Sequence, residues 1–370
     1  MKLVLAGGGT AGHINPALAI AQEVMAREPN SEILFVGNQN SMEETLITKA
    51  GFPIRFIKIQ GFNRRQLHKN LTTVKLLFSS IKQAEKILKD FSPDMVVGTG
   101  GYVSGPVLFA ATKLGPHTCI HEQNAFPGLT TKILSRRVEK VFTSFENSHQ
   151  YFKVPEKLML VGNPLRREFA ALDRETSRKE LGLTKDDFYV LSFGGSLGAT
   201  VLNRIVVEEL KKTKQSGEFV RCHAMGKLGK DWMPEKLKEL GIPVGESDGP
   251  FRIVDFIYDM PRQIAAADVV ISRAGAITLG ELTAQSKVSV LIPSPNVTNN
   301  HQYHNANALA VKGAAVMIEE KDLSADKLYD TLLSLKQDAD RRTALAKAAG
   351  DMALVNASSL IYEEMKRLIG

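Results

Sequence analysis

Short apolar runs rich in β-branched residues alternate along this 370-residue chain with longer segments whose apolar positions recur every three or four residues. The apolar runs cover residues 2–6, 33–36, 95–98, 188–193, 268–272 and 288–292, and the helical patterns cover 16–26, 107–114 and 201–212. Strands that alternate with helices indicate a parallel sheet covered by helices on both faces. Because the pattern starts twice, the predicted fold class is α/β, with two doubly wound parallel-sheet domains.

The length of the chain and the breaks in its pattern predict where these domains divide. A chain of 370 residues is too long for one ordinary core and fits two domains of about 150 to 200 residues each. Gly162 and the Asn163–Pro164 pair interrupt regular structure between the two halves. We therefore expect an N-terminal domain over 1–163 and a C-terminal domain over 164–350. From the pattern alone, a last helix over about 358–367 could pack on either domain.

The positive charge of the chain is confined to its first half. Residues 1–163 contain 19 Lys and Arg against 12 Asp and Glu, whereas residues 164–370 contain 28 of each kind. This asymmetry favours an anionic partner for the first half, a phosphorylated ligand or an acidic lipid surface, although scattered solubilising lysines give the same count. Two cysteines are too few for a disulfide framework and suit a reducing cytoplasm. No run of about 20 apolar residues is present to span a membrane.

The first strand runs into the glycine-rich segment Gly7–His13, and a helix is expected to begin at about Asn15–Pro16. Small residues allow backbone N–H groups and a helix N-terminus to approach an anion closely. The spacing of Gly7, Gly9 and Gly12 also matches the dinucleotide fingerprint, which requires an acidic residue at the end of the second strand. That strand is followed by Asn38, Gln39 and Asn40, which disfavours a nicotinamide cofactor.

Two further glycine-rich segments follow predicted strands, Gly98–Pro106 in the first half and Phe193–Ala199 in the second. Neither ends in Gly-Lys-Ser/Thr, so the nucleotide site of P-loop ATPases is not expected. Glycine turns also serve tight packing, but open α/β sheets bind their ligands at the carboxyl ends of strands, where all three loops are predicted. Two such loops in one domain and one in the other suggest two phosphorylated ligands that meet across a cleft, as a transferase reaction requires.

Polar clusters stand at other predicted strand ends and are candidates to bind sugar hydroxyls. They are His121–Asn124, Ser272–Ala276 with Glu281 beyond it, and Asn299–Gln302. Each cluster taken alone is equally well explained as helix caps and surface residues.

Together these motifs resemble a bacterial glycosyltransferase family of peptidoglycan synthesis. Its members move N-acetylglucosamine from UDP-N-acetylglucosamine onto undecaprenyl-diphospho-N-acetylmuramyl-pentapeptide. The matching segments are Gly7–His13, Gly98–Pro106, His121–Asn124, Gly162–Arg166, Gly194–Ala199, Ser272–Glu281 and Asn300–Ala306. The resemblance implies a GT-B fold, in which two Rossmann-like domains face each other across a cleft, and a C-terminal helix within 351–370 that returns to the first domain.

By the same resemblance, the UDP-sugar lies mainly on the C-terminal domain. Its implied contacts are Ser196 at the diphosphate, the backbone of Ile257 at uracil, Glu281 at the ribose, Gln302 at the sugar, and the segment formed by Ala276, Ile277, Thr278, Leu279 and Gly280 around the nucleoside. Thr10, Ala11, Gly12, Asn124 and Arg166 would reach the donor from elsewhere. His301 and Gln302 stand where some members of the family carry two glutamines, which leaves the contact at His301 open.

The implied reaction is an inverting displacement, which needs a base for the 4-hydroxyl of the acceptor. His13 is the preferred base because an imidazole titrates near neutral pH, with Glu122 second; His13 could instead only orient a phosphate. The acceptor's diphosphate or sugar is predicted to contact Gly100, Gly101, Tyr102, Ser104 and His121. We expect no cofactor, and no essential metal ion because the chain lacks the Asp-x-Asp motif of metal-dependent sugar transferases.

A lipid-linked acceptor implies that the protein works at the cytoplasmic face of the cell membrane, bound peripherally. Residues 64–89 offer basic side chains beside an apolar stripe at helical spacing, which is typical of binding to an anionic lipid surface and equally of a buried helix face. The basic residues are Arg64, Arg65, Lys69, Lys75, Lys82, Lys86 and Lys89, and the stripe is Leu71, Val74, Phe78 and Ile81. Other proteins of cell-wall synthesis are possible partners.

Two other functions also fit the paired domains and a UDP-sugar site. A non-hydrolysing UDP-sugar epimerase would share the paired domains but would not need the second glycine loop, and a sugar-nucleotide sensor would bind without turnover. A nucleic-acid partner is not expected, because the basic residues are not interleaved with aromatic stacking residues and no helix-turn-helix or zinc-finger signature is present.

Overall fold

The computed structural model describes the whole chain except residues 62–69, 166–168, 170–171, 196 and 246–248. The described residues divide into two compact units. Unit 1 comprises Met1–Arg166 together with Leu354–Gly370, and unit 2 comprises Arg167–Ala353.

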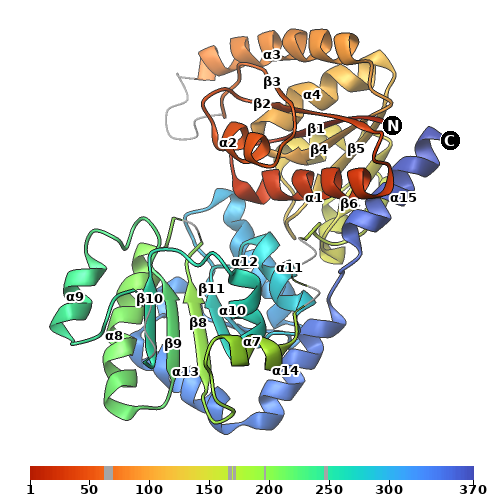
Figure 1. Ribbon diagram of the computed structural model, residues 1–370. Helices are drawn as coiled ribbons and strands as arrows, with labels where there is room; N and C mark the ends of the chain where they lie inside the picture. The colour runs from red at the N-terminus through yellow and green to blue at the C-terminus, as the bar shows by residue number, and fades with distance from the viewer. Residues whose placement is uncertain (62–69, 166–168, 170–171, 196, 246–248) are drawn as a thin grey trace. The chain divides into compact units, whose positions relative to one another are not determined.

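In the described part of unit 1, seven strands form one parallel sheet (Figure 1). In spatial order the strands are β3 (Ile54–Phe56), β2 (Glu32–Gly37), β1 (Lys2–Gly7), β4 (Met95–Gly100), β5 (His117–Glu122), β6 (Lys140–Thr143) and β7 (Leu158–Leu160). Its main helices are α1 (Ala11–Arg27), α2 (Met42–Lys49), α3 (Asn70–Phe91), α4 (Gly101–Leu114), α5 (Leu129–Leu134) and α15 (Ala357–Ile369). The sheet therefore has the doubly wound order that the sequence pattern predicts.

Alternate residues of each strand of unit 1 bury against different helices, as the period of two dictates. Leu3 and Leu5 of β1 share a core with Ile20 of α1 and Ile361 of α15. Val4 on the opposite face belongs to the core formed with α3 and α4. Both faces are covered, which explains why β1 is apolar without interruption over residues 3–6.

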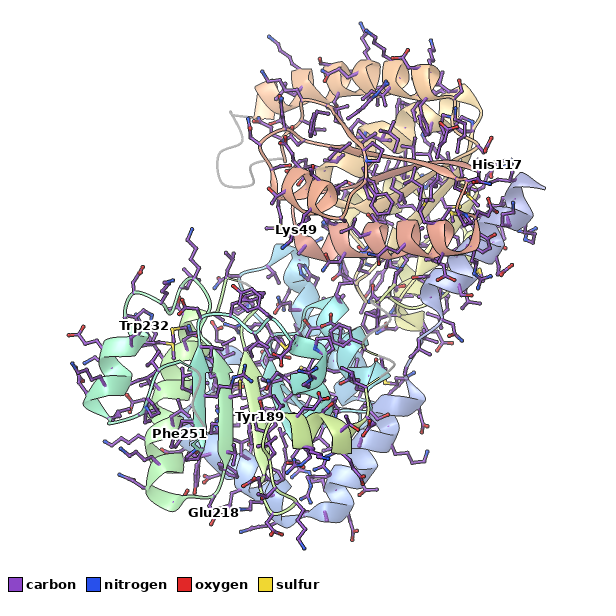
Figure 2. The ribbon with its side chains drawn as sticks, viewed as in Figure 1. Lys49, His117, Tyr189, Glu218, Trp232 and Phe251 are labelled. Atoms are coloured by element: carbon purple, nitrogen blue, oxygen red, sulfur yellow. The ribbon has the colours of Figure 1, made fainter. Side chains whose placement is uncertain are left out.

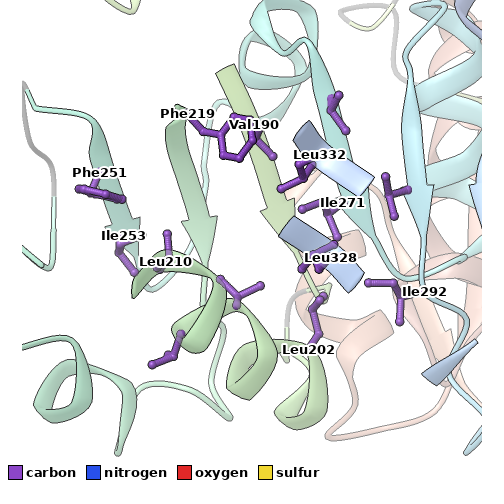
Figure 3. Packing of buried hydrophobic residues seen from close by; sticks show 14 of the residues in the cluster. Val190, Leu202, Leu210, Phe219, Phe251, Ile253, Ile271, Ile292, Leu328 and Leu332 are labelled. Atoms are coloured by element: carbon purple, nitrogen blue, oxygen red, sulfur yellow. The ribbon is translucent and has the colours of Figure 1, made fainter. Parts of the chain in front are cut away.

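Unit 2 repeats the same architecture around six parallel strands in its described residues. Their spatial order is β10 (Phe251–Val254), β9 (Val220–Ala224), β8 (Tyr189–Phe193), β11 (Val269–Ser272), β12 (Ser289–Leu291) and β13 (Val316–Met317). The helices are α7 (Arg174–Glu180), α8 (Thr200–Ser216), α9 (Met233–Glu239), α10 (Met260–Ala266), α11 (Ala276–Ala284), α12 (His301–Ala310), α13 (Ala325–Gln337) and α14 (Ala339–Asp351). In Figure 3, Val190 and Ile271 of the sheet pack with Leu202 of α8 and with Leu328 and Leu332 of α13.

Two expected boundaries are wrong by a helical turn or more. Helix α1 begins at Ala11 rather than near Asn15, so Pro16 lies inside it. Helix α4 begins at Gly101, so the second half of the predicted loop Gly98–Pro106 is helical, with Pro106 inside the helix. In both cases proline stands in the sixth helical position, close enough to the helix start that the missing N–H removes one bond from the second turn and leaves the rest of the helix intact.

Candidate active site

The first two glycine-rich loops meet at one point of unit 1. Strands β1 and β4 are neighbours, and the crossover direction reverses between them, which is where open α/β sheets bind ligands. The register shifts after Ala6, so that Gly7 lies opposite Gly100. The two loops therefore form one glycine-lined surface at the carboxyl edge of the sheet.

This contact between the loops requires glycine. Gly100 and Gly101 have φ angles of 106° and 76°, which favour glycine. A Cβ at Gly101 would lie 2.0 Å from the carbonyl oxygen of Gly8, and one at Gly100 would lie 2.6 Å from Cδ2 of His13. The glycines of the second loop thus let its backbone touch the first loop and the ring of His13.

His13 is held from several directions in the first turn of α1. Its Nδ1 lies 3.1 Å from the carbonyl oxygen of Gly8 and 3.1 Å from Oγ1 of Thr10. The hydroxyl of Thr99 donates to the carbonyl oxygen of His13 at 2.7 Å. Because the oxygen of Gly8 can only accept, Nδ1 carries the hydrogen, and in the neutral ring Nε2 carries the basic lone pair.

The N-terminus of α1 has no side-chain cap at Thr10. By contrast, Ser41 caps α2 and Asp173 caps α7 through their side chains. The first-turn N–H groups at Ala11 and Gly12 precede the intrahelical bonds and point out of the helix end. They are placed to bind an anion, as the sequence predicts for Thr10, Ala11 and Gly12.

Ser104 and His121 lie inside the protein. Ser104 is fully buried, accepts from the N–H of Gly100 at 2.9 Å and donates to main-chain oxygens. His121 is also fully buried, and its Nε2 donates to the carbonyl oxygen of Gly162 at 2.9 Å while Nδ1 accepts from Nε2 of Gln123. Burial lowers the pKa of His121 to about 4, so the ring stays neutral. Both side chains support the loops, and their polar atoms are already bonded to protein.

Glu122 organises the loop that carries Asn124. It is 3% exposed, accepts from the backbone N–H of Asn124 at 3.1 Å and from that of Gly128 at 2.9 Å, and also accepts from the side-chain amide of Asn124. A carboxylate that accepts three hydrogen bonds from its own loop is poorly suited to take the acceptor's proton. Asn124 itself is half-buried at the end of β5.

Tyr102 of α4 and Glu43 of α2 pack against the first glycine-rich loop. The ring of Tyr102 packs on Gly9, where a Cβ would come within 2.8 Å of it, and burial followed by the charge of Glu43 raises the pKa of Tyr102. Glu43 of α2 is fully buried and its Oε2 accepts from the N–H of Gly9 at 3.3 Å. Glu43 is not among the predicted site residues, because no pattern of the sequence indicates that α2 packs beneath this loop.

In unit 2, the third glycine-rich loop is held by the segment over 225–232, which the sequence pattern did not predict as part of the site. Gly198 and Gly226 both have positive φ, and their backbones touch, because a Cβ at Gly226 would lie 2.3 Å from the nitrogen of Gly198. Asn203 of α8 is fully buried and donates to the carbonyl oxygen of Met225 at 2.7 Å. Trp232, which is labelled in Figure 2, donates its indole N–H to the carbonyl oxygen of Leu228 in the same segment at 2.9 Å. The signal for it was the pair of glycines at 226 and 229.

The loop over 194–199 leads into α8, whose N-terminus also has no side-chain cap. Ser196, the predicted diphosphate contact, and Arg166 lie outside the described residues. In the part of the chain that the structure describes, no three His, Cys, Asp or Glu side chains gather in the way that metal ligands do.

The predicted nucleoside segment forms the first turns of α11. Its N-cap is Gly275, without a side-chain cap, and it follows β11, the neighbour of β8 at the switch point of this sheet. Ala276 and Leu279 are buried, whereas Ile277, Thr278, Gly280 and Glu281 are half-buried. Ile257 is 3% exposed between the exposed rings of Phe256 and Tyr258, so its backbone rather than its side chain is available to a base.

Gln302 lies in the first turn of α12 and is partly committed to the protein. Its Oε1 accepts from the N–H of Ser294 at 2.9 Å, so the oxygen of this amide is used within unit 2. His301 Nδ1 lies 2.8 Å from the oxygen of Thr298. Arg273, a member of the predicted cluster Ser272–Ala276, donates to the carbonyl oxygen of Ile292 and to the carboxylate of Glu320, and so links the segments that follow β11, β12 and β13.

Family models match most of the chain. Residues 3–143 match the glycosyltransferase family 28 N-terminal domain, and residues 189–361 match the glycosyltransferase family 28 C-terminal domain. A protein of Acetivibrio thermocellus is 46% identical over 369 residues, covering 100% of this chain and 98% of that protein. The chain belongs to glycosyltransferase family 28. This confirms the predicted class of enzyme, and the resemblance drawn from the motifs.

Two curated relatives of this family 28 chain carry the same functional name. The A. thermocellus protein is named UDP-N-acetylglucosamine–N-acetylmuramyl-(pentapeptide) pyrophosphoryl-undecaprenol N-acetylglucosamine transferase. A protein of Thermoanaerobacter sp. with the same name is 43% identical over 368 residues and is covered completely.

Solved structures confirm the GT-B fold of the family 28 chain. The crystal structure of Acinetobacter baumannii MurG superposes with a TM-score of 0.78 at 27% identity, covering 99% of both chains. A UDP-GlcNAc 2-epimerase of Neisseria meningitidis bound to UDP-GlcNAc gives a TM-score of 0.67 at 14% identity, covering 99% of this chain and all of that one. The second likeness is one of fold alone, so the epimerase alternative gains no support beyond the shared architecture.

Proposed function

We propose that this enzyme transfers N-acetylglucosamine from UDP-N-acetylglucosamine to the 4-hydroxyl of undecaprenyl-diphospho-N-acetylmuramyl-pentapeptide, with inversion at the anomeric carbon. The observation that carries the proposal is the full-length identity of 46% to a relative named for this transfer. The site adds physical support, because α1, α8 and α11 each begin at the carboxyl edge of a parallel sheet, and none of their N-cap residues makes a side-chain capping hydrogen bond.

The donor half of the proposal belongs to unit 2. Uncapped N–H groups of α8 would bind the diphosphate, and the backbone of Ile257 would meet uracil. Glu281 would accept from the ribose hydroxyls, while the amide of Gln302 would donate to the sugar. Ser196, Arg166 and the first-turn residues Thr10, Ala11 and Gly12 stay as predicted donor contacts, together with Asn124.

The acceptor half belongs to unit 1. Gly100 and Gly101, next to Tyr102, have no side chain, so a diphosphate or sugar could approach their backbone groups closely. Ser104 and His121 act on this surface indirectly. Ser104 accepts from the N–H of Gly100, and His121 accepts from the amide of Gln123, which also donates to the carbonyl oxygen of Thr99.

His13 is proposed as the base. Its Nε2 takes the proton of the acceptor's 4-hydroxyl while that oxygen bonds the anomeric carbon. The bond from the anomeric carbon to the β-phosphate oxygen breaks, and UDP leaves with the electron pair. The positive end of α8 would stabilise the charge that develops on the leaving diphosphate.

We also propose that the outer face of α3 binds an anionic membrane surface at the cytoplasmic side. Phe78 is 65% exposed, and Lys75, Lys82 and Lys86 are exposed beside it. Ile81 packs on the core, so only part of the predicted stripe faces outward. The predicted Arg64, Arg65 and Lys69, and the side chains of Leu71 and Val74, lie outside the described residues. In the described chain, no helix has the length and apolar character needed to cross a membrane.

Transfer of radiolabelled N-acetylglucosamine to a short-chain lipid-diphospho-muramyl-peptide tests the proposed reaction. We expect label in the lipid product only when both substrates are present, and a product whose new bond joins the 4-hydroxyl. Conversion of UDP-N-acetylglucosamine to another nucleotide sugar without acceptor would favour the epimerase. Binding of the donor without any turnover would favour the sensor.

A further inference from the structure

The peptide unit between Gly8 and Gly9 is bonded on both sides by side chains that titrate. Its carbonyl oxygen accepts from Nδ1 of His13 at 3.1 Å, and its N–H donates to Oε2 of Glu43 at 3.3 Å. Oε1 of the same carboxylate accepts from the N–H of Asn38 at 3.3 Å, which fixes Glu43 beneath the loop. A single amide therefore connects a fully buried carboxylate to the imidazole of His13, the proposed base.

An amide can transmit the effect of one hydrogen bond to the other. Resonance couples the N–H of a peptide to its carbonyl group. A carboxylate that accepts from the N–H increases the negative charge on the carbonyl oxygen, and chains of hydrogen bonds polarise one another in this way. The oxygen of Gly8 then becomes a better acceptor for Nδ1–H, most of all when the His13 ring is protonated. The buried negative charge adds a direct Coulombic attraction for the imidazolium.

We propose that Glu43 is a positioning residue that raises the basicity of His13 through the Gly8–Gly9 peptide, an arrangement equivalent to a carboxylate–histidine pair with an amide inserted between its members. This rests on the proposed role of His13 as the base. In the transfer step, the proton of the 4-hydroxyl moves to Nε2, and the positive charge of the imidazolium is balanced by Glu43 until the proton is released to solvent.

The other titratable groups near His13 do not replace Glu43 in this role. Tyr102 packs on Gly9, and because burial and Glu43 raise its pKa, it remains a neutral phenol. His121, on β5, is kept neutral by burial. Glu122, at the end of β5, accepts from the loop that it organises.

An NMR titration of the histidine rings tests the proposal directly. In the Glu43→Gln variant we expect the pKa of His13 to fall by on the order of one pH unit, because the protonated ring loses its anionic partner. The acidic limb of the kcat/KM profile should move to lower pH by the same amount. The His13 signal among the eight histidines is assigned by its absence in His13→Asn.

Glu44→Gln is the matched control. It removes the same charge from the next position of α2, where the carboxylate accepts from the N–H of Asn40 at 2.6 Å instead. We expect this variant to leave the pKa of His13 unchanged. An unchanged pKa in Glu43→Gln, or equal shifts in both variants, would overturn the proposal.

The wild-type protein gives a second, independent answer if Glu43→Gln does not fold. At a pH above the pKa of His13, the nitrogen chemical shifts of the neutral ring must show that the hydrogen is on Nδ1. A hydrogen on Nε2 instead would contradict the proposed bond from Nδ1 to the carbonyl oxygen of Gly8. The titration does not depend on turnover. A wild type that binds both substrates without transfer would therefore refute the proposed function while the bridge could still be observed.

Discussion

At the residue scale, three histidines of this enzyme show how the surroundings decide the chemistry of one side chain. His13 is half-buried, and one ring nitrogen is bonded to the backbone of its own loop. His121 and His223 are fully buried, and burial lowers the pKa of His121 to about 4 and, helped by the charge of Arg221, that of His223 to about 3. Of these three, only His13 is partly exposed, which is why it is the one proposed as the base.

The buried His223 should make unit 2 sensitive to acid. Its folded pKa lies below the unfolded value of 6.5, so the unfolded chain binds the proton more readily. The stability contributed above pH 6.5 is lost as the pH falls toward 3, by roughly 4 kcal/mol in all. Trp232, the one tryptophan of the chain, reports on unit 2 in denaturant titrations. The loss should be clearly smaller in His223→Gln, and an equal loss there would contradict this assignment.

The sequence located residues by type and spacing, but it did not reveal their depth. Ser104 and His121 have the same polar character as residues that bind ligands, and only the packing of β4, β5 and α4 shows that their polar atoms face inward. Glu43 was missed for the opposite reason, since its contact with Gly9 spans 34 positions. Such contacts depend on how α2 packs, which local pattern does not encode.

At the scale of elements, the strand-to-helix turns were predictable because each needs glycine. The three glycine-rich loops follow β1, β4 and β8, two of them on either side of one switch point. The segment around Gly226, which holds the third glycine-rich loop of unit 2, was not predicted. A pair of glycines in a polar stretch also fits an ordinary turn. Only the close contact between the backbones of Gly226 and Gly198 shows that this segment supports the loop.

Replacement of Gly226 tests this contact. In Gly226→Ala we expect the affinity for UDP-N-acetylglucosamine to fall by about tenfold or more, a loss of at least about 1.4 kcal/mol, because the new Cβ displaces the loop before α8. Gly217→Ala is the control, with a similar φ of 71° and nothing within 4 Å of the added atom. The Gly217→Ala variant should lower the free energy of unfolding by about 1 kcal/mol and leave the affinity for UDP-N-acetylglucosamine unchanged. Calorimetric titration measures both, and equal losses of affinity would contradict the proposed contact.

At the scale of the whole molecule, the last helix returns to the first unit: α15 belongs to unit 1 and packs on α1. Ile361, Tyr362 and Met365 bury in the core that α1 lines. Gly162, at the exit from unit 1, has a φ of 89° and touches Leu354, at the return to it. The pattern of the sequence left the partner of this helix open, because an amphipathic helix shows which face it buries and not against what.

The polar contacts of α15 give this packing a pH dependence. Glu28 accepts from the hydroxyl of Tyr362 at 2.9 Å and from Lys366 at 2.8 Å, and the bond from Lys366 is the first cause that lowers its pKa to about 2. This stabilisation is present above pH 4.5 and is lost as the pH falls toward 2. Glu28→Gln should therefore lower the unfolding temperature of unit 1 at neutral pH and make little difference near pH 2. Because Lys366 is 41% exposed, solvent screening should keep the effect modest, and a difference that persists in acid would contradict it.

We propose that the glycine loops of unit 1 present His13 as the base of the transfer. The transfer rate of His13→Gln, measured with both substrates saturating and beside the affinity of the variant for UDP-N-acetylglucosamine, tests this role. We expect kcat to fall by about 10² to 10⁴ with nearly unchanged donor affinity, because only the proton transfer is removed. A variant that retains most of the wild-type kcat would show that another group takes the proton and that His13 only shapes the loop.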